Sequence, residues 1–462
     1  MENVNKLNKE SVVTKKIDRE YQQLLKNSAE ETKKSLPHYA KIQNYRLVEN
    51  NNSFNGRMIP TSLKPRFITR AQENHIKTRT QLYLKLLGRL GEILSSSPAA
   101  QRYFSITEAE IKYLKNQTTT HHLPTVRCDG CLDKEKGFRI FEANTNAPAV
   151  VGFIQQAWQV TNQLPAWQKI KKKYKIAPNT LNPQQILKVL LENYQAWGGN
   201  KPHPPILILR WPDQYNQDSD FLAQEFQKLG YRTTIAYPTQ LHYDGHGLYY
   251  LGTKYELILR WFDLNLITET APMYQDLLRA YFDNKICLMS SPASAIYGHK
   301  SLPAFFTDKQ FSQYLTDHER KILGEMCPWT RPLRSMKTEF QPGKKENLYD
   351  ITIKYKNKLL LKKSISTYGK DIVFGQKTSL PEWKKTLNKV KKDKWIVQEV
   401  IDLPRDYEPC LTKKGLTRKL FYHDINPYLV NGKYLGCFAR FSPNLVTNVI
   451  KKGTLQVVGR VS

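Results

Sequence analysis

Short apolar runs separated by polar turns recur along the middle of the chain and predict β-strands. Residues 123–150 contain a pair of such strands around a polar turn. Residues 204–261 predict an α/β unit. Its elements are strands at 206–209, 233–236 and 257–261 and a helix at 218–229.

Apolar residues at helical spacing prevail in the N-terminal part of the chain. Residues 1 to about 36 are polar and lysine-rich with a helical period, and residues 50–56 form a loop. Residues 68–94 have the pattern of a long amphipathic helix, which the run Ser95-Ser96-Ser97-Pro98 ends. We therefore expect residues 1–104 to form an N-terminal helical region.

The C-terminal third predicts a strand, a flexible loop and a second strand. Residues 358–362 are apolar up to a final lysine, residues 364–371 are small and polar, and residues 372–374 are apolar again. Residues 394–401 form a further apolar strand that runs into a Gln-Glu pair.

The length and composition allow several globular domains. A chain of 462 residues with 40% hydrophobic and 11% aromatic content can build two or three domains with sizeable cores. We expect residues 105–330 to hold the strand pair and the α/β unit, and residues 331–462 to form a separate lobe.

Cysteine usage and hydropathy favour a cytoplasmic protein. The six cysteines are spread thinly, which fits reduced thiols better than a disulfide framework. The first residues lack a basic stretch followed by an apolar core, and 18 consecutive apolar residues occur nowhere. We expect a protein without a structural disulfide that is neither secreted nor membrane-spanning.

The net charge of +30 raises a nucleic-acid-binding protein as one class of function. The lysines are dispersed over every segment, however, and no arginine-rich arm or known nucleic-acid-binding motif is present. Dispersed lysines indicate a solvated surface, and such a surface could also attract an acidic partner such as a carrier protein, a tRNA or a polyanionic substrate. The charge alone does not choose among these.

Polar residues with metal-binding chemistry lie in the strand pair of residues 123–150. Arg127 and Asp129 are two positions apart in the first strand, as are Glu142 and Asn144 in the second. Alternate residues of a strand share a face, so each pair points to one side. Magnesium prefers oxygen ligands and is usually bound together with substrate phosphates. The pattern predicts Asp129, Glu142 and Asn144 as magnesium ligands, with Arg127 facing the phosphates.

A zinc or redox site is the alternative for this segment. Cys128 and Cys131 form a CxxC motif, and His121 and His122 lie close to it in sequence. The chain has no second CxxC, and the motif lies in a predicted strand rather than at the helix start of a thioredoxin-like site. Magnesium chemistry is therefore favoured.

The Arg-x-Asp and Glu-x-Asn segments, followed far downstream by a lysine-ended strand, a loop and a Gln-Glu strand, resemble the circularly permuted ATP-grasp family. This family includes glutathionylspermidine synthase. The resemblance extends loosely over residues 105–462, and the metal segment precedes the nucleotide lobe, as the permutation requires. It implies an α/β fold, namely a permuted ATP-grasp with an additional α/β substrate-side domain and an N-terminal helical region.

The resemblance also implies contacts to the nucleotide phosphates. Lys337 and Lys362 would approach the phosphates, and Lys370 keeps the family's spacing of eight positions after Lys362. The loop between these two lysines holds only Gly369, where the family's loop is glycine-rich. Arg440 would reach the phosphates or an acyl phosphate.

Further residues would hold the adenine and the substrate. Gln398, Glu399 and Ile401 match the hinge that binds the purine. Arg260, at a strand end, would meet a substrate carboxylate. Residues 291–300 resemble a family segment that ends in a small-residue turn and a lysine.

The implied function is that of an ATP- and Mg²⁺-dependent carboxylate–amine ligase that forms an amide through an acyl phosphate and releases ADP. Amino acids, small peptides, a polyamine or a peptide terminus are the substrate classes that the resemblance suggests. Two alternatives remain open: a basic nucleic-acid-binding protein that keeps the fold, and a nucleotide-binding pseudoenzyme.

Overall fold

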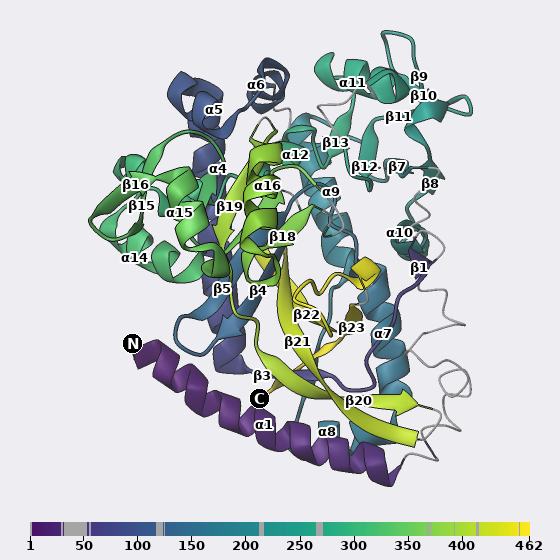
Figure 1. The fold of residues 1–462 in the computed structure, drawn as a ribbon. Helices are drawn as coiled ribbons and strands as arrows, with labels where there is room; N and C mark the ends of the chain where they lie inside the picture. The colour runs from purple at the N-terminus through teal and green to yellow at the C-terminus, as the bar shows by residue number, and fades with distance from the viewer. Residues whose placement is uncertain are drawn as a thin grey trace.

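The computed structural model describes residues 2–28, 31, 53–54, 57–116, 123, 125–211, 217–264, 271–366, 369, 371–391, 393–412, 415–451 and 453–462. The fold is mixed α/β, as predicted, with several separate sheets. In Figure 1, β7, β12 and β13 of the parallel sheet lie at the upper right, and the β15–β16 hairpin lies at the left.

The largest sheet joins strands from the middle and the end of the chain. Its order is β23-β22-β21-β4-β5, and β20 pairs with another part of the long strand β21. All of these pairs are antiparallel. The strands are β4 (Thr125–Asp133), β5 (Gly137–Asn144), β20 (Arg405–Thr412), β21 (Gly415–Val430), β22 (Lys433–Ser442) and β23 (Thr454–Gln456). Strands β4 and β5 form the predicted strand pair.

The predicted α/β unit is a four-stranded parallel sheet in the order β13-β12-β7-β8. Strand β7 is buried along its whole length, as parallel strands covered on both faces are. A small antiparallel sheet, β11-β10-β9, is inserted in the chain between β8 and β12. The strands are β7 (Ile206–Leu209), β8 (Thr233–Ala236), β9 (His242–Tyr243), β10 (Leu248–Tyr250), β11 (Thr253–Tyr255), β12 (Leu257–Arg260) and β13 (Cys287–Met289).

The antiparallel lobe is the sheet β14-β19-β17-β18, covered by helices α15 and α16. It has its own core around Trp383 and Leu361. The hairpin of β15 and β16 stands beside it (Figure 1). The strands are β14 (Thr330–Pro332), β15 (Lys337–Gln341), β16 (Lys344–Asn347), β17 (Leu359–Lys363), β18 (Ile372–Phe374) and β19 (Trp395–Glu399).

A three-stranded sheet, β3-β24-β6, joins one strand from the N-terminal region, one from the middle of the chain and the last strand. Strand β24 pairs parallel with β3 and antiparallel with β6. The strands are β3 (Arg66–Thr69), β6 (Ala177–Asn179) and β24 (Val458–Val461), and a short pair is formed by β1 (Ser53–Phe54) and β2 (Arg57–Met58).

The helices agree with the sequence pattern where that pattern is long. Helix α4 (Arg70–Ser96) begins at a capping box formed by Thr69 and Gln72, and Ser97 caps the next helix. Helix α1 (Glu2–Asn27) runs along one edge of the molecule (Figure 1). None of the described helices is long and apolar enough to span a membrane. The others are α5 (Pro98–Phe104), α6 (Glu108–Lys115), α7 (Val151–Gln163), α8 (Pro165–Tyr174), α9 (Pro183–Trp197), α10 (Gln217–Lys228), α11 (Gln275–Phe282), α12 (Ala293–Tyr297), α13 (Ala304–Thr307), α14 (Asp317–Met326), α15 (Leu348–Lys354) and α16 (Leu380–Val390).

The sheets cross the predicted boundary at residue 331. Strands β14–β19 form the antiparallel lobe, but β20–β23 pair with β4 and β5 in the largest sheet. The spacing of apolar residues along a strand does not reveal which distant strand it will pair with. This pairing brings Arg440, on β22, close to Asp129, on β4.

Candidate functional site

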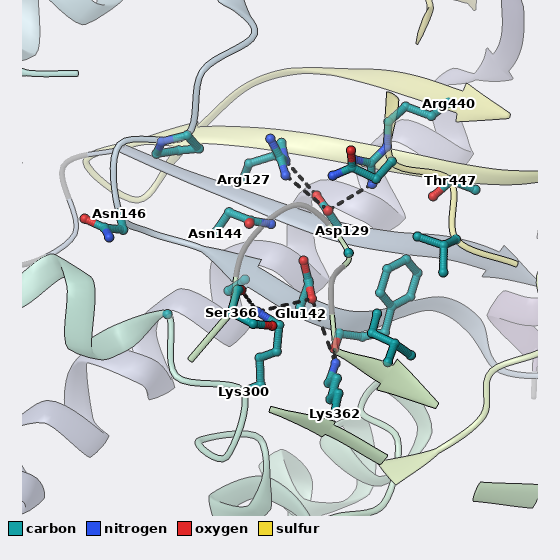
Figure 2. A pocket seen from close by; sticks show the side chains of 18 of the residues that line it. Arg127, Asp129, Glu142, Asn144, Asn146, Lys300, Lys362, Ser366, Arg440 and Thr447 are labelled. Carbon is teal, nitrogen blue, oxygen red and sulfur yellow. Dashed lines mark hydrogen bonds and ion pairs between the residues drawn. The ribbon is translucent and has the colours of Figure 1, made fainter. Parts of the chain in front are cut away.

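A cavity of about 320 Å³ lies where the largest sheet, the antiparallel lobe and the end of β12 meet (Figure 2). This volume is in the range of small-ligand sites. The sequence-predicted residues that line it are Arg127, Asp129, Glu142, Asn144, Lys362, Gln398, Glu399, Ile401 and Arg440. The fold therefore collects in one cavity residues that are more than 300 positions apart in the chain.

The hairpin of β4 and β5 places four of these residues directly opposite one another. Asp129 faces Glu142 across the ladder, and Arg127 faces Asn144. The register shifts after Asp129, where Gly130 follows. A Cβ atom on Gly130 would lie 2.2 Å from the carbonyl oxygen of Arg139, so only glycine fits there. The Asp-Gly sequence therefore supports the close approach of the two strands.

Asp129 is held between two arginines. Nε and Nη2 of Arg127 donate to its two carboxylate oxygens at 2.7 and 3.2 Å, and Nη2 of Arg440 donates to Oδ2 at 2.9 Å. Burial alone would raise the pKa of Asp129, but the two guanidinium groups outweigh it and hold the pKa below its usual range. The carboxylate is ionised at neutral pH.

Arg440 is anchored from its other side by Asp424, which faces it across β21 and β22. Nε and Nη2 of Arg440 donate to Asp424 Oδ2 at 2.9 and 2.6 Å, and the Thr447 hydroxyl donates to the same oxygen. Asn426 completes the group through hydrogen bonds to both residues. Arg127, Asp129, Arg440 and Asp424 form the arginine wall of the cavity.

Glu142 faces two lysines on the opposite side, which we call the lysine wall. Nζ of Lys300 and Nζ of Lys362 each lie 3.9 Å from Glu142 Oε2 (Figure 2). Lys362 also donates to the carbonyl oxygen of Phe141 at 3.3 Å. Burial lowers the pKa of Lys362 to about 8, although Glu142 opposes this shift. Lys362 thus presents a partly desolvated ammonium group to the cavity.

Lys300 connects this wall to the loop that follows β17. Its Nζ donates to the Ser366 carbonyl oxygen at 2.7 Å, and its backbone N–H donates to the Ser364 carbonyl oxygen at 2.9 Å. Gly369 in the same loop has a positive φ of 62°, and a Cβ atom there would lie 2.8 Å from Val446. The single glycine of this loop is therefore required by its backbone conformation.

The predicted hinge lies at the end of β19. Gln398 is buried and donates to the Thr330 hydroxyl at 2.8 Å, so its side chain supports the lobe. The Glu399 carboxylate accepts from the Trp329 N–H at 3.2 Å and lies 3.5 Å from Arg139. Strand β19 thus ends at the cavity with residues 398–401 lining its wall.

Two of the sequence-predicted residues, Lys337 and Arg260, are described and do not line this cavity. Lys337 is exposed at the start of β15 and is not part of the cavity lining. Arg260 is completely buried and bonds to protein groups, as described below. Lys370 lies outside the described residues. The sequence does not distinguish an exposed basic residue from a buried one, because residue spacing does not show which groups a side chain will contact.

The site also includes Lys300, Asp424 and Asp263, none of which was predicted as a site residue from the sequence. Lys300 ends the small-residue segment that resembles the family, so a signal for it was present. Asp424 faces Arg440 across the hairpin of β21 and β22. Asp263 follows the β12 strand and lines the cavity, without any motif to single it out.

The oxygen donors of the cavity fit magnesium. Glu142 accepts no hydrogen bond from a described residue, and the Asn144 Nδ2 atom is buried without a described partner. Amide orientation is assigned from partners, so Asn144 can present its oxygen instead. Both carboxylate oxygens of Asp129 accept hydrogen bonds from arginines, and the lone pairs that remain can bind a metal ion. Among the described residues, no group of three or more His, Cys, Asp or Glu side chains is placed so that it could hold a metal ion by itself, and all six cysteines are buried free thiols. These donors suit a hard cation that keeps several waters.

No family model matches the chain, and no curated protein matches it. Among solved structures, the chain is similar to a glutathione synthetase-like effector from Globodera pallida. The TM-score is 0.58 at 11% identity, and the alignment covers 94% of this chain and 97% of that chain. At this identity the likeness establishes a shared fold over nearly the whole length.

A structure assigned as gamma-glutamylcysteine synthetase from Methylobacillus flagellatus is also similar. Its TM-score is 0.41 at 14% identity, with 80% of this chain and 86% of that chain covered. This score is too low to carry an argument about fold or site.

Proposed function

We propose that this chain is an ATP- and Mg²⁺-dependent carboxylate–amine ligase with a circularly permuted ATP-grasp arrangement. The observation that carries the proposal is the cavity itself: Asp129 and Glu142 face each other there, enclosed by two arginines and two lysines. The fold shared with a glutathione synthetase-like protein supports the same reaction class.

Groups on both walls would take part in binding ATP and its magnesium ion. Lys362 and Lys300 surround the place next to Glu142, and phosphate oxygens there would accept from their ammonium groups. The adenine would lie at residues 398–401, where β19 ends at the cavity. Glu142 and Asn144, with Asp129, would hold magnesium. The bound metal would neutralise phosphate charge and fix the orientation of the triphosphate.

The reaction then needs positioning more than covalent chemistry by the protein. The substrate carboxylate attacks the γ-phosphorus and ADP leaves. The acyl phosphate that forms loses inorganic phosphate when the amine attacks its carbonyl carbon. Arg127 and Arg440 are fixed by Asp129 and Asp424, so their remaining donors are preorganised for an anionic acyl phosphate.

Residues 364–366 would help to keep water away from the acyl phosphate. They lie over the cavity through their bonds to Lys300, and Gly369 packs against Val446 beside them. Exclusion of water matters because an acyl phosphate hydrolyses readily. The cytoplasmic location and the acidic macromolecular partner remain predictions from the sequence.

ADP release tests this function. Purified protein is supplied with ATP, Mg²⁺ and a pool of amino acids, glutathione and polyamines, and wild type is compared with Glu142→Ala. We expect substrate-dependent ADP release that falls by roughly 10²–10³-fold in the variant, because a group that orients the reacting charge is lost. Glu135→Ala, at the exposed turn of the same hairpin, is the matched control and should behave as wild type.

The alternatives predict different results. A nucleic-acid-binding protein would release no ADP from any pool and would bind RNA or DNA with a steep dependence on salt that Glu142→Ala leaves unchanged. A pseudoenzyme would bind Mg²⁺-ATP in a calorimetric titration without turnover.

A further inference from the structure

Asp263 brings an additional carboxylate to the cavity from the side of the parallel sheet. It follows strand β12 in the chain and is half-buried in the cavity lining. Among the described residues, none donates a hydrogen bond to its carboxylate or lies at ion-pair distance from it. A half-buried carboxylate without a direct protein partner is costly in free energy, and a cationic ligand group would supply the missing partner.

Arg260 fixes the loop that carries Asp263. The Arg260 guanidinium is fully buried and donates to the Ser290 carbonyl oxygen at 2.9 Å, to Asn146 Oδ1 at 2.7 Å and to the Phe262 carbonyl oxygen. Asn146 in turn exchanges hydrogen bonds with the backbone of Leu264 at 3.0 and 3.1 Å.

These bonds hold Phe262 and Leu264, the two neighbours of Asp263, close to the segment that follows β5 and its predicted metal ligands. Arg260, which the sequence analysis assigned to a substrate carboxylate, instead positions an acidic side chain. The geometry of Asp263 relative to the predicted phosphate site is thus set by buried hydrogen bonds rather than by a free loop.

Within the described part of the chain, the charged groups that face Asp263 come from three elements. They are Arg127 from β4, Arg260 from β12 and Lys300 from the segment after α12. Burial raises the pKa of Asp263 to about 6, although all three cations oppose the shift. The carboxylate is therefore ionised at neutral pH and is more basic than an exposed aspartate, which suits a group that must accept a proton.

Formation of an amide from an ammonium ion removes two protons from the nitrogen, one before or during the attack and one after it. An alkyl amine with a pKa of about 10 is an ammonium ion at neutral pH, and its nitrogen has no free electron pair. On the basis of the ligase function proposed above, we propose that Asp263 binds the ammonium group of the amine substrate and takes its proton. The nitrogen pair then attacks the carbonyl carbon, the C–N bond forms, and the C–O bond to the phosphate breaks. Inorganic phosphate leaves with that electron pair and takes the second proton from the nitrogen, which leaves the neutral amide. Asp263 passes the first proton to water.

The substrate class follows from this geometry. The amine component is a primary amine that arrives as a cation and is drawn between Asp263 on one side and the anionic acyl phosphate on the other. Asp263 would pair with the ammonium group of the amine. Arg127 and Lys300, which lie within electrostatic range of Asp263, would pair with the anionic acyl phosphate in the same cavity.

Hydroxylamine separates this role from a general role in ATP turnover, because it is uncharged at neutral pH and attacks acyl phosphates without a base. Wild type, Asp263→Asn and Asp263→Glu are incubated with ATP, Mg²⁺ and the pool of amino acids and glutathione. The nucleophile is either hydroxylamine, with hydroxamate as the product, or glycine and spermidine, with ADP and phosphate as the products. Asp350→Asn, exposed on α15, is the matched control.

We expect Asp263→Asn to lose at least about 10²-fold with the charged amines and to keep hydroxamate formation within about threefold. The rate with charged amines in wild type should fall as the pH drops through about 6, because the carboxylate becomes protonated, and this limb should be absent in Asp263→Asn. Asp263→Glu should restore part of the amine reaction.

Equal loss of both reactions in Asp263→Asn, or no loss of either, would overturn the role of Asp263 while leaving the ligase function in place. Failure of wild type to release ADP or form hydroxamate with any member of the pool would overturn the ligase function and the role of Asp263 with it.

Discussion

The two walls of the cavity carry similar charges but are built in opposite ways. On the arginine wall, Asp129 and Arg440 are joined to Arg127 and Asp424 by several hydrogen bonds of 2.6–3.2 Å. On the lysine wall, Glu142 meets each lysine only at 3.9 Å. The arginine wall comes from one sheet, whereas the lysine wall combines β5, β17 and the segment after α12.

The difference shows how one cavity can be both rigid and adjustable. Planar guanidinium groups bound by two carboxylates keep their geometry before a ligand arrives. An ammonium group at 3.9 Å from its partner can move to a phosphate oxygen at little cost, because no close hydrogen bond is lost. The arginine wall would therefore hold the acyl phosphate, and the lysine wall would adapt to the nucleotide.

The largest effect is expected from breaking the arginine wall. Arg440→Met leaves Asp129 and Asp424 as neighbouring buried carboxylates, with Arg127 as the remaining cation. Removing one partner of a buried ion pair typically costs about 3–5 kcal/mol of unfolding free energy. Urea denaturation, compared with Arg418→Met at an exposed position of β21, measures this loss. A loss below about 1 kcal/mol would contradict the view that this wall is rigid.

A smaller effect is expected on the lysine wall. Lys362→Met should weaken binding of Mg²⁺-ATP by roughly tenfold to a hundredfold at pH 7, since one charge-assisted contact is lost. It should not lower the unfolding free energy, because the variant no longer buries an ammonium group. Isothermal titration measures the binding, and Lys358→Met, an exposed lysine before β17, is the control.

The same substitution has a pH signature. The pKa of Lys362 in the folded protein, about 8, lies below its unfolded value, so the unfolded chain holds the proton more tightly. Between pH 8 and the ordinary lysine pKa, this residue therefore makes the protein more stable as the pH rises. ATP affinity should fall over the same interval, because the ammonium group is lost. Wild type that shows neither trend, or Lys362→Met that shows both, would contradict this assignment.

The smallest effect is expected outside both walls. Lys337→Ala changes an exposed side chain that is not part of the cavity lining, so ATP affinity and ADP release should stay within about twofold of wild type. The binding and turnover assays above measure it. A loss of ATP affinity as large as that of Lys362→Met would instead show that Lys337 contacts the nucleotide phosphates, as the sequence resemblance implied.

The sequence predicted the local strands better than the contacts that form the two walls. The β4–β5 hairpin was predicted because alternation and a polar turn are local signals, and its register brings Asp129 opposite Glu142. Strand β17 was predicted from its local apolar run, whereas the role of Lys362 at its end was implied by the family resemblance. The α/β unit appears with all of its predicted strands.

The remaining parts depend on contacts that no local pattern contains. The hydrogen bond from Arg440 to Asp129 joins β22 to β4, which are about 300 positions apart in the chain. Lys337 and Arg260 differ from the lysines and arginines of the walls only in burial and partners. Asp263 is placed by Arg260 and Asn146, whose bonds connect residues more than 100 positions apart.

The order of the strands also has a consequence for synthesis on the ribosome. Strand β4 pairs with β21, and about 270 residues separate the end of β5 at Asn144 from the start of β21 at Gly415. At about 5–20 residues per second, a ribosome needs roughly 15 to 55 seconds to make that stretch. During this time the edge of β4 that pairs with β21 has no partner strand, and a nascent chain arrested before Gly415 would expose that edge.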